Sequence, residues 1–126
     1  MKSTENLLYW PIWKEEKILL IPSKQGYEFI QPSQITYIAA ARSYCNIHLI
    51  NDGNLLVSKS LKQLSNLLPS RYFFRIHHSY LVNVFLIART NNQDGDLIEL
   101  KNGEKLPVSQ RRKDNFIRFM TELKVR

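Results

Sequence analysis

The sequence predicts a mainly antiparallel β domain with one short internal helix and one C-terminal helix. From Lys17 onward, short runs rich in β-branched and aromatic residues alternate with turns that contain glycine, asparagine or aspartate. Only two stretches place apolar residues three and four positions apart, which is the spacing of a helix. Strands do not alternate with long helical stretches, so the pattern argues against a doubly wound parallel sheet and the enzymes built on it.

The first half of the domain is predicted to form strands. Asn51-Asp52-Gly53 closes a hairpin because Asp-Gly tolerates the positive φ that a tight hairpin requires. In the strand before this hairpin, one face holds Cys45, Ile47 and Leu49 while Asn46 and His48 share the other, which is typical of a half-buried strand. A further turn is predicted at residues 23–26. The predicted strands of this half cover residues 17–21, 27–30, 35–39, 44–50 and 55–59.

The second half is predicted to contain both helices. A short helix begins after Ser58 or Ser60, either of which can cap it, and Pro69 ends it. Its apolar face consists of Leu61, Leu64 and Leu68. The C-terminal helix covers residues 110–123, with an inward face made of Phe116, Phe119, Met120 and Leu123. Strands are expected at 72–76, 97–101 and 105–108, with turns at Asp94-Gly95 and Asn102-Gly103.

Length and composition indicate one domain with its own core. The chain has 126 residues, of which 44% are apolar. Residues 17–126 are assigned to the domain, and residues 1–16 to an N-terminal tail or linker whose apolar side chains are expected to pack on this domain, an upstream domain or a second copy. A single cysteine excludes an internal disulfide, and no signal peptide or membrane span is recognisable. The expected location is the cytoplasm.

The charge distribution indicates an anionic partner. The formal net charge is +7, and residues 53 to 93 contain no aspartate or glutamate while they carry five lysines and arginines. A second basic cluster is Arg111-Arg112-Lys113. Composition alone leaves open whether these cations bind nucleic acid or form an ordinary solvated face.

The residues that carry enzyme chemistry lack the required spacing. His77 and His78 are adjacent, so on a strand their side chains point to opposite faces and cannot form a pair of metal ligands. Three of the four glycines stand in Asp-Gly or Asn-Gly turns, so no phosphate-binding glycine loop is present. Cys45 lies on an apolar strand face, which favours a buried structural thiol over a nucleophile. We therefore predict no enzyme, no metal site and no cofactor.

Two segments of the sequence contain side chains that can form hydrogen bonds with DNA phosphates and base edges. Residues 71–83 combine core-forming apolar residues with Arg75, His77, His78 and Asn83, although such groups can equally satisfy local backbone. Around residue 109, a good N-cap serine precedes three cations in the first turn, where the helix dipole disfavours positive charge. A helix start that breaks this rule is suited to hold a phosphate.

These stretches resemble the LytTR DNA-binding domain. The string FRIHHSYLVN at residues 74–83 is similar to the signature of that family, and so is LPVSQRR at residues 106–112. ITYI at 35–38 followed by YCNIH at 44–48 resembles its first β pair, and SLKQL at 60–64 resembles its short helix. The order and spacing hold from about residue 17 to residue 123. One departure is Arg42-Ser43, which stands where the family often has Gly-Asn.

The resemblance implies stacked small antiparallel sheets that recognise double-stranded DNA from loops in the major groove. It assigns base contacts to Arg42, Ser43, His78 and Arg111. The phosphate contacts that it implies are Lys59, His77, Ser79, Asn83, Ser109 and Arg112. For Asn83 a structural role, fixing the turn after Val82, is the slightly favoured alternative.

The implied function is that of the output domain of a bacterial transcription regulator, of a two-component system. Family members typically bind repeated half-sites in promoter DNA with two copies, and often follow a receiver domain that a sensor kinase controls. Two alternatives stay open. One is an interaction module of the same fold that sequesters another regulator, and the other is an RNA-binding β domain, which would carry aromatic residues on an exposed sheet face.

Overall fold

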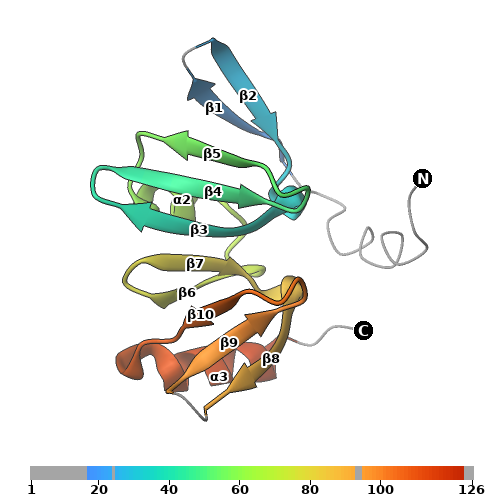
Figure 1. Ribbon diagram of the computed structural model, residues 1–126, viewed down its shortest axis with the longest axis vertical. Helices are drawn as coiled ribbons and strands as arrows, with labels where there is room; N and C mark the ends of the chain where they lie inside the picture. Colours follow the sequence, from blue (N-terminus) through green and yellow to red (C-terminus); the bar gives the residue numbers. More distant parts are fainter. Residues whose placement is uncertain (1–16, 24, 93–94, 124–126) are drawn as a thin grey trace, which may run out of the picture.

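Three small antiparallel sheets follow one another along the long axis of the molecule (Figure 1). The computed structural model describes residues 17–23, 25–92 and 95–123. The predicted tail, residues 1–16, and Asp94 of one predicted turn lie outside the described residues. The mainly β architecture with stacked sheets, a short internal helix and a C-terminal helix is confirmed.

The first sheet is a hairpin of two strands, β1 (Leu19–Ser23) and β2 (Gly26–Ile30). Side chains alternate between its two faces, as the pleat of a strand requires. Leu19, Ile21 and Ile30 point toward the domain and are buried, which anchors the hairpin to the core.

The central sheet has five strands in the order β5-β4-β3-β7-β6. Its strands are β3 (Ile35–Ala41), β4 (Tyr44–Leu49), β5 (Asn54–Val57), β6 (Phe73–His77) and β7 (Tyr80–Asn83). A 3₁₀ turn, η2 (Pro32–Gln34), leads into β3, and a second one, η3 (Val84–Leu86), follows β7. Asp52 has a φ of 71° in the β4–β5 turn, as the Asp-Gly pair predicts.

The third sheet lies at the C-terminal end and has the order β10-β9-β8. Its strands are β8 (Ile87–Asn91), β9 (Leu97–Leu100) and β10 (Lys105–Pro107). A 3₁₀ turn, η4 (Gln110–Arg112), then leads into the helix α3 (Lys113–Glu122). The predicted C-terminal helix of residues 110–123 therefore begins as a 3₁₀ turn.

The short internal helix, α2 (Leu61–Leu67), is capped by Ser60. The Ser60 hydroxyl accepts a hydrogen bond from the Gln63 amide at 3.0 Å, and the Gln63 side chain accepts one from the Ser60 amide at 2.8 Å. This reciprocal capping box decides between the two serines that the sequence offered. It also fixes where the chain turns after β5.

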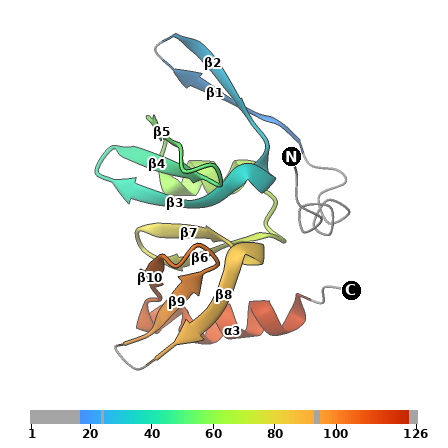
Figure 2. The ribbon, with the colours of Figure 1, turned by 45° about the vertical axis from the view of Figure 1, so that its right-hand side comes forward.

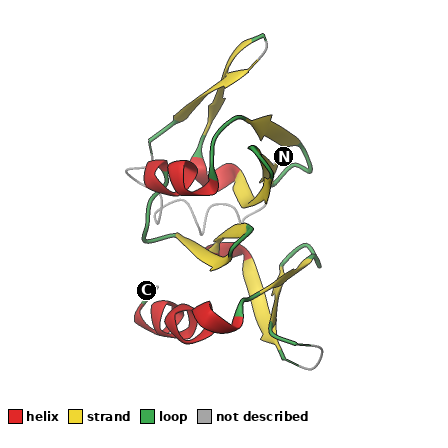
Figure 3. Ribbon diagram, turned by 90° about the vertical axis from the view of Figure 1, so that its left-hand side faces the viewer, coloured by secondary structure: helices red, strands yellow, loops and turns green. Residues whose placement is uncertain are grey.

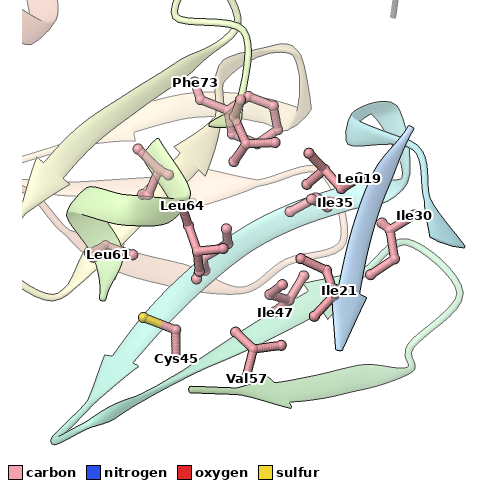
Figure 4. Close-up of a cluster of buried hydrophobic side chains, with 13 residues drawn as sticks. Leu19, Ile21, Ile30, Ile35, Cys45, Ile47, Val57, Leu61, Leu64 and Phe73 are labelled. Atoms are coloured by element: carbon pink, nitrogen blue, oxygen red, sulfur yellow. The ribbon is translucent and has the colours of Figure 1, made fainter. Parts of the chain in front are cut away.

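Two buried clusters hold the sheets together. The first lies between the hairpin, α2 and the central sheet, and Figure 4 shows side chains from all three elements meeting in it. Cys45 is 1% exposed within this cluster, which confirms its predicted burial, and burial raises the pKa of its thiol. The second cluster joins the central sheet to the C-terminal sheet and α3; it contains Tyr37, Ile76, Val82, Val84, Ile98, Leu100, Leu106, Val108 and Phe116.

The two helices cover the same side of the stacked sheets, α2 behind the central sheet and α3 behind the C-terminal one (Figures 2 and 3). Two strands, β7 and β8, were not among the predicted elements. Among the described residues, neither helix has the length and apolar character that crossing a bilayer requires.

Candidate nucleic-acid interface

Three loops converge on one edge of the molecule, the left edge in Figure 1. They are the β3–β4 turn, the β6–β7 turn and η4. Two backbone hydrogen bonds connect them, since the Ala40 amide donates to the Ser79 carbonyl and the Ser109 amide donates to the Ile76 carbonyl, both at 2.9 Å. We call residues 42–43, 78–79 and 109–112 the loop edge.

The β3–β4 turn places Arg42 and Ser43 at the tip of a hairpin, where both are exposed. Arg42 has a φ of 60°, a left-handed conformation that costs a non-glycine residue about 1–2 kcal/mol. Strained backbone of this kind is common at functional sites. The turn therefore presents a cationic side chain at a position that glycine would occupy with less strain.

The β6–β7 turn presents His78, which is exposed, on a backbone held by its neighbours. The pairing of β6 with β7 shifts register between Arg75 and His77, so a bulge precedes the turn. The Arg75 guanidinium donates to the carbonyl oxygens of His77, at 3.3 Å, and His78, at 2.5 Å. Bulge and guanidinium together fix the direction in which His78 leaves the sheet.

His77 and Ser79 flank His78 and are half-buried. The Ser79 amide donates to Nδ1 of His77 at 3.0 Å, so the neutral imidazole carries its proton on Nε2. The same ring packs against Tyr80, with 5.6 Å between ring centroids. His77 thus shapes the turn through Nδ1 and keeps Nε2–H as a hydrogen-bond donor.

The turn η4 carries Arg111, which is exposed, and Arg112, which is half-buried. Both arginines precede the first residue of α3, so they are not in its first α-helical turn, contrary to the simple helix start that the sequence predicted. Lys113 does occupy that turn, and its Nζ lies 3.0 Å from an Asp96 carboxylate oxygen. This ion pair offsets the unfavourable interaction of Lys113 with the helix dipole.

Lys59 lies beside the loop edge. It follows β5, whose last residue, Val57, pairs with Cys45 next to the β3–β4 turn. Lys59 is half-buried and precedes the capped start of α2. Because β5 pairs with β4, the segment that contains Lys59 lies on the same side of the molecule as the loop edge.

The loop edge is cationic because its arginines lack carboxylate partners. Among the described residues, the ion pairs are Arg89 with Glu99 and Lys113 with Asp96, and neither involves the loop edge. The pKa of Arg75 is lowered by burial and also by the positive charge of Arg112. Two guanidinium groups from β6 and η4 therefore repel each other where the loops meet, which favours a bound anion there.

Asn83 is not part of this edge, and its assignment as a phosphate contact is not supported. It is 2% exposed and stands at the other end of β7. Its Nδ2 donates to the Ile35 carbonyl at 3.0 Å, and its Oδ1 accepts from the Phe85 amide at 3.1 Å. Asn83 thus fixes the turn into η3, which was the favoured alternative.

Ser109 contributes its backbone amide, but not its side chain, to the contacts of the loop edge. Its backbone has the extended conformation of an N-cap, with φ −69° and ψ 146°, but the side chain makes no capping bond. The hydroxyl oxygen is buried and has no hydrogen-bond partner in the described part of the chain. The predicted contact from this hydroxyl to a phosphate therefore does not fit the structure, because the oxygen is shielded from solvent.

Other polar clusters lie away from the loop edge. Tyr37 stacks on His48 with 4.2 Å between ring centroids, and its hydroxyl donates to Glu104 at 3.0 Å. Burial, and then this hydrogen bond, raise the pKa of Tyr37. Within the described ranges, no group of three or more histidine, cysteine, aspartate or glutamate side chains could hold a metal ion.

A β domain that presents exposed arginine, serine and histidine side chains from three adjoining loops is organised as a nucleic-acid-binding module. The chain belongs to the LytTR family, since the family model described as "LytTr DNA-binding domain" matches residues 25–121. This family is one of DNA-binding domains and not of enzymes, and it is typical of the output domains of response regulators. The resemblance found in the sequence is confirmed.

The fold is also similar to a solved structure. It is described as the LytTr DNA-binding domain of a methyl-accepting/DNA response regulator from Bacillus cereus. The TM-score is 0.71 at 25% identity, and the match covers 82% of this chain and 95% of the other. No curated protein sequence gives a significant match.

Proposed function

We propose that this chain binds double-stranded promoter DNA in a sequence-specific way, as the output domain of a bacterial transcription regulator in a two-component system. The observation that carries the proposal is the convergence of the exposed residues Arg42, Ser43, His78 and Arg111 on one edge. Arginine, serine and histidine can donate to base edges in the major groove, and arginine can bind guanine with two hydrogen bonds.

The surrounding residues are assigned to the DNA backbone. Lys59, His77, Ser79 and Arg112 are half-buried and border the exposed tips, which suits contacts that position the duplex. Ser109 and Asn83 are left out because their polar side-chain atoms are buried. The Arg75 guanidinium, already bonded to the turn carbonyls, is assigned to positioning His78.

The regulator is proposed to act in the cytoplasm with two copies on repeated half-sites. An upstream receiver domain or a sensor kinase would supply the signal. Membership of the LytTR family supports this context, since the family is typical of response-regulator output domains.

Selection of bound duplexes from a random pool tests the proposal. The chain should enrich a defined sequence, whereas a variant with Arg42→Ala, His78→Ala and Arg111→Ala should stay folded and enrich none. The matched control is Lys105→Ala with Arg118→Ala, which also removes two cations but from exposed positions in β10 and α3. Equal enrichment by the triple variant would refute loop recognition. An absence of enrichment by the parent chain would favour the sequestering module.

Salt dependence tests the backbone contacts. If five or six phosphates are neutralised, log affinity should fall against log salt with a slope of about −5. Lys59→Ala should weaken matched and scrambled duplexes alike and reduce that slope by about 1. A competing RNA duplex or single strand that displaces the DNA at equal concentration would point to the RNA-binding alternative.

A further inference from the structure

The outer face of the β1–β2 hairpin is apolar and exposed. Leu20 and Phe29 are directly paired across the two strands and are 51% and 71% exposed. Ile18, which precedes β1, is 56% exposed, and Tyr27 in β2 is 62% exposed. The inner face of the same hairpin is buried in the core, so this apolar outer face is additional to what anchoring the hairpin requires (Figure 4).

Such a face is typical of an interaction surface. Single exposed apolar residues are common, but a contiguous group on a small domain marks a site that another segment or protein covers. The hairpin lies at the opposite end of the molecule from η4 (Figure 1), so the proposed DNA contacts do not use it. Strand β1 also precedes residues 25–121, the part that the family model matches.

The segment that directly precedes β1 has the matching chemistry. Residues 7–13 read LLYWPIW and contain both tryptophans of the chain, and the charged residues Lys14, Glu15 and Glu16 separate them from Lys17. From Trp13 to Ile18 the chain spans at most about 17 Å when extended. A five-residue strand has about the same length, so Trp13 can reach any point of the hairpin face.

We propose that residues 7–13 dock on the outer face of the β1–β2 hairpin and cover Ile18, Leu20, Tyr27 and Phe29. Docking within one chain is favoured over pairing with a second copy because a short tether gives an effective concentration in the millimolar range. The charged residues between the segment and the hairpin stay in solvent. The segment thereby completes the N-terminal sheet as an apolar cover.

Tryptophan fluorescence tests the proposal directly, because Trp10 and Trp13 are the only tryptophans of the chain. In the full chain we expect emission that is blue-shifted from that of the unfolded protein, and strong protection from acrylamide quenching. Both should be independent of protein concentration, with a monomer in sedimentation. Emission equal to that of the unfolded protein would overturn the proposal, and so would protection that appears only together with a dimer.

Substitutions on the face locate the contact. Leu20→Ser with Phe29→Ser should shift the emission to the red and increase acrylamide quenching several-fold. The matched control is Ile50→Ser with Leu56→Ser, which changes residues that are 56% and 60% exposed outside the hairpin, and it should leave the emission unchanged. Protection that persists in the face variant, with circular dichroism unchanged, would place the tryptophans elsewhere and refute the proposal.

A variant of the segment provides a second readout that does not alter the hairpin. Trp10→Ser with Trp13→Ser should uncover the face and increase binding of the dye 8-anilinonaphthalene-1-sulfonate several-fold. The Leu20→Ser and Phe29→Ser changes, added to this variant, should remove the increase. Dye binding equal to that of the parent chain would contradict docking on this face.

Discussion

The two ends of strand β7 carry opposite kinds of polar residue. At one end, His78 is exposed in the turn that enters the strand. At the other, Asn83 is 2% exposed and uses both its amide oxygen and its amide nitrogen in hydrogen bonds to the backbone. A single ten-residue string, FRIHHSYLVN, thus contains a candidate DNA contact and a residue that holds the fold.

The same contrast extends to the neighbouring strands. At the end of the sheet that holds the loop edge, Arg42 and Arg111 are exposed and have no carboxylate partner among the described residues, and the backbone is strained at Arg42. The far end is closed by the stack of Tyr37 on His48 and by the bond from Tyr37 to Glu104. Substitutions at the far end should therefore act on stability, and substitutions at the loop edge on DNA binding.

The largest expected effect is the loss of stability in Asn83→Ala. The change removes the hydrogen bonds that Asn83 makes with the Ile35 carbonyl and the Phe85 amide. Removing one partner of a buried hydrogen bond costs about 1–3 kcal/mol, so the free energy of unfolding in urea should fall by about 2–6 kcal/mol. His78→Ala serves as the control and should change stability by less than about 0.5 kcal/mol. Equal stability of the two variants would contradict the claim that Asn83 stabilises the fold while His78 does not.

The next effect concerns recognition by Arg111. Arg111→Ala should cost about 1–3 kcal/mol of binding to the selected duplex and less on a scrambled duplex, because a base contact is specific. Arg118→Ala removes an exposed cation from α3 and should cost little on either duplex. Fluorescence anisotropy titrations measure all four combinations, and an equal loss on both duplexes for Arg111→Ala would show that Arg111 contacts the backbone.

A smaller effect separates strain from recognition at Arg42. Glycine accepts a φ of 60° without the penalty that a side chain meets, so Arg42→Gly should be more stable than Arg42→Ala by about 1 kcal/mol. Both variants should bind the selected duplex more weakly than the parent chain, since both lack the guanidinium. If urea unfolding gives the same stability for both, the left-handed conformation is not a source of strain.

The smallest effect is a pH dependence from the far end. Burial lowers the pKa of His48 below its ordinary value of 6.5, although Glu104 acts in the opposite direction. The unfolded chain therefore takes up a proton at a pH at which folded His48 does not, and stability should decline as pH falls through 6.5 toward the lowered value.

His48→Phe keeps a ring beside Tyr37 and should flatten this decline. Urea unfolding between pH 7.5 and pH 5.5 compares the two proteins, and His77 and His78 are present in both as internal controls. A decline of the same size in the variant would assign it to other groups.

Patterns within the sequence predicted most of the local elements. Turn residues located the β1–β2 and β4–β5 hairpins, and leucine spacing located α2, because local backbone preferences and periodicity act over a few residues. The alternation around Cys45 predicted its burial. Strands β7 and β8 were missed, since β7 is a run of buried residues without alternation and β8 has mostly exposed ones.

The candidate site was predicted in part, for a similar reason. Local pattern and the family resemblance both indicated His78 and Arg111, whereas Arg42 followed from the resemblance alone; all three lie exposed in turns. The sequence could not tell that Arg75 bonds to the His77 and His78 carbonyls, because that geometry depends on the bulge in β6. It also could not exclude Asn83 and Ser109, whose burial arises from contacts with distant segments.

The sequence by itself determined the β-rich class, the basic charge and the family. Only the tertiary structure decided which polar side chains share an edge, because strand order places β7 beside β3 and a hydrogen bond joins Ser109 to Ile76. Local preferences act between residues that are near in sequence, whereas the loop edge is assembled by pairing between residues far apart in the chain.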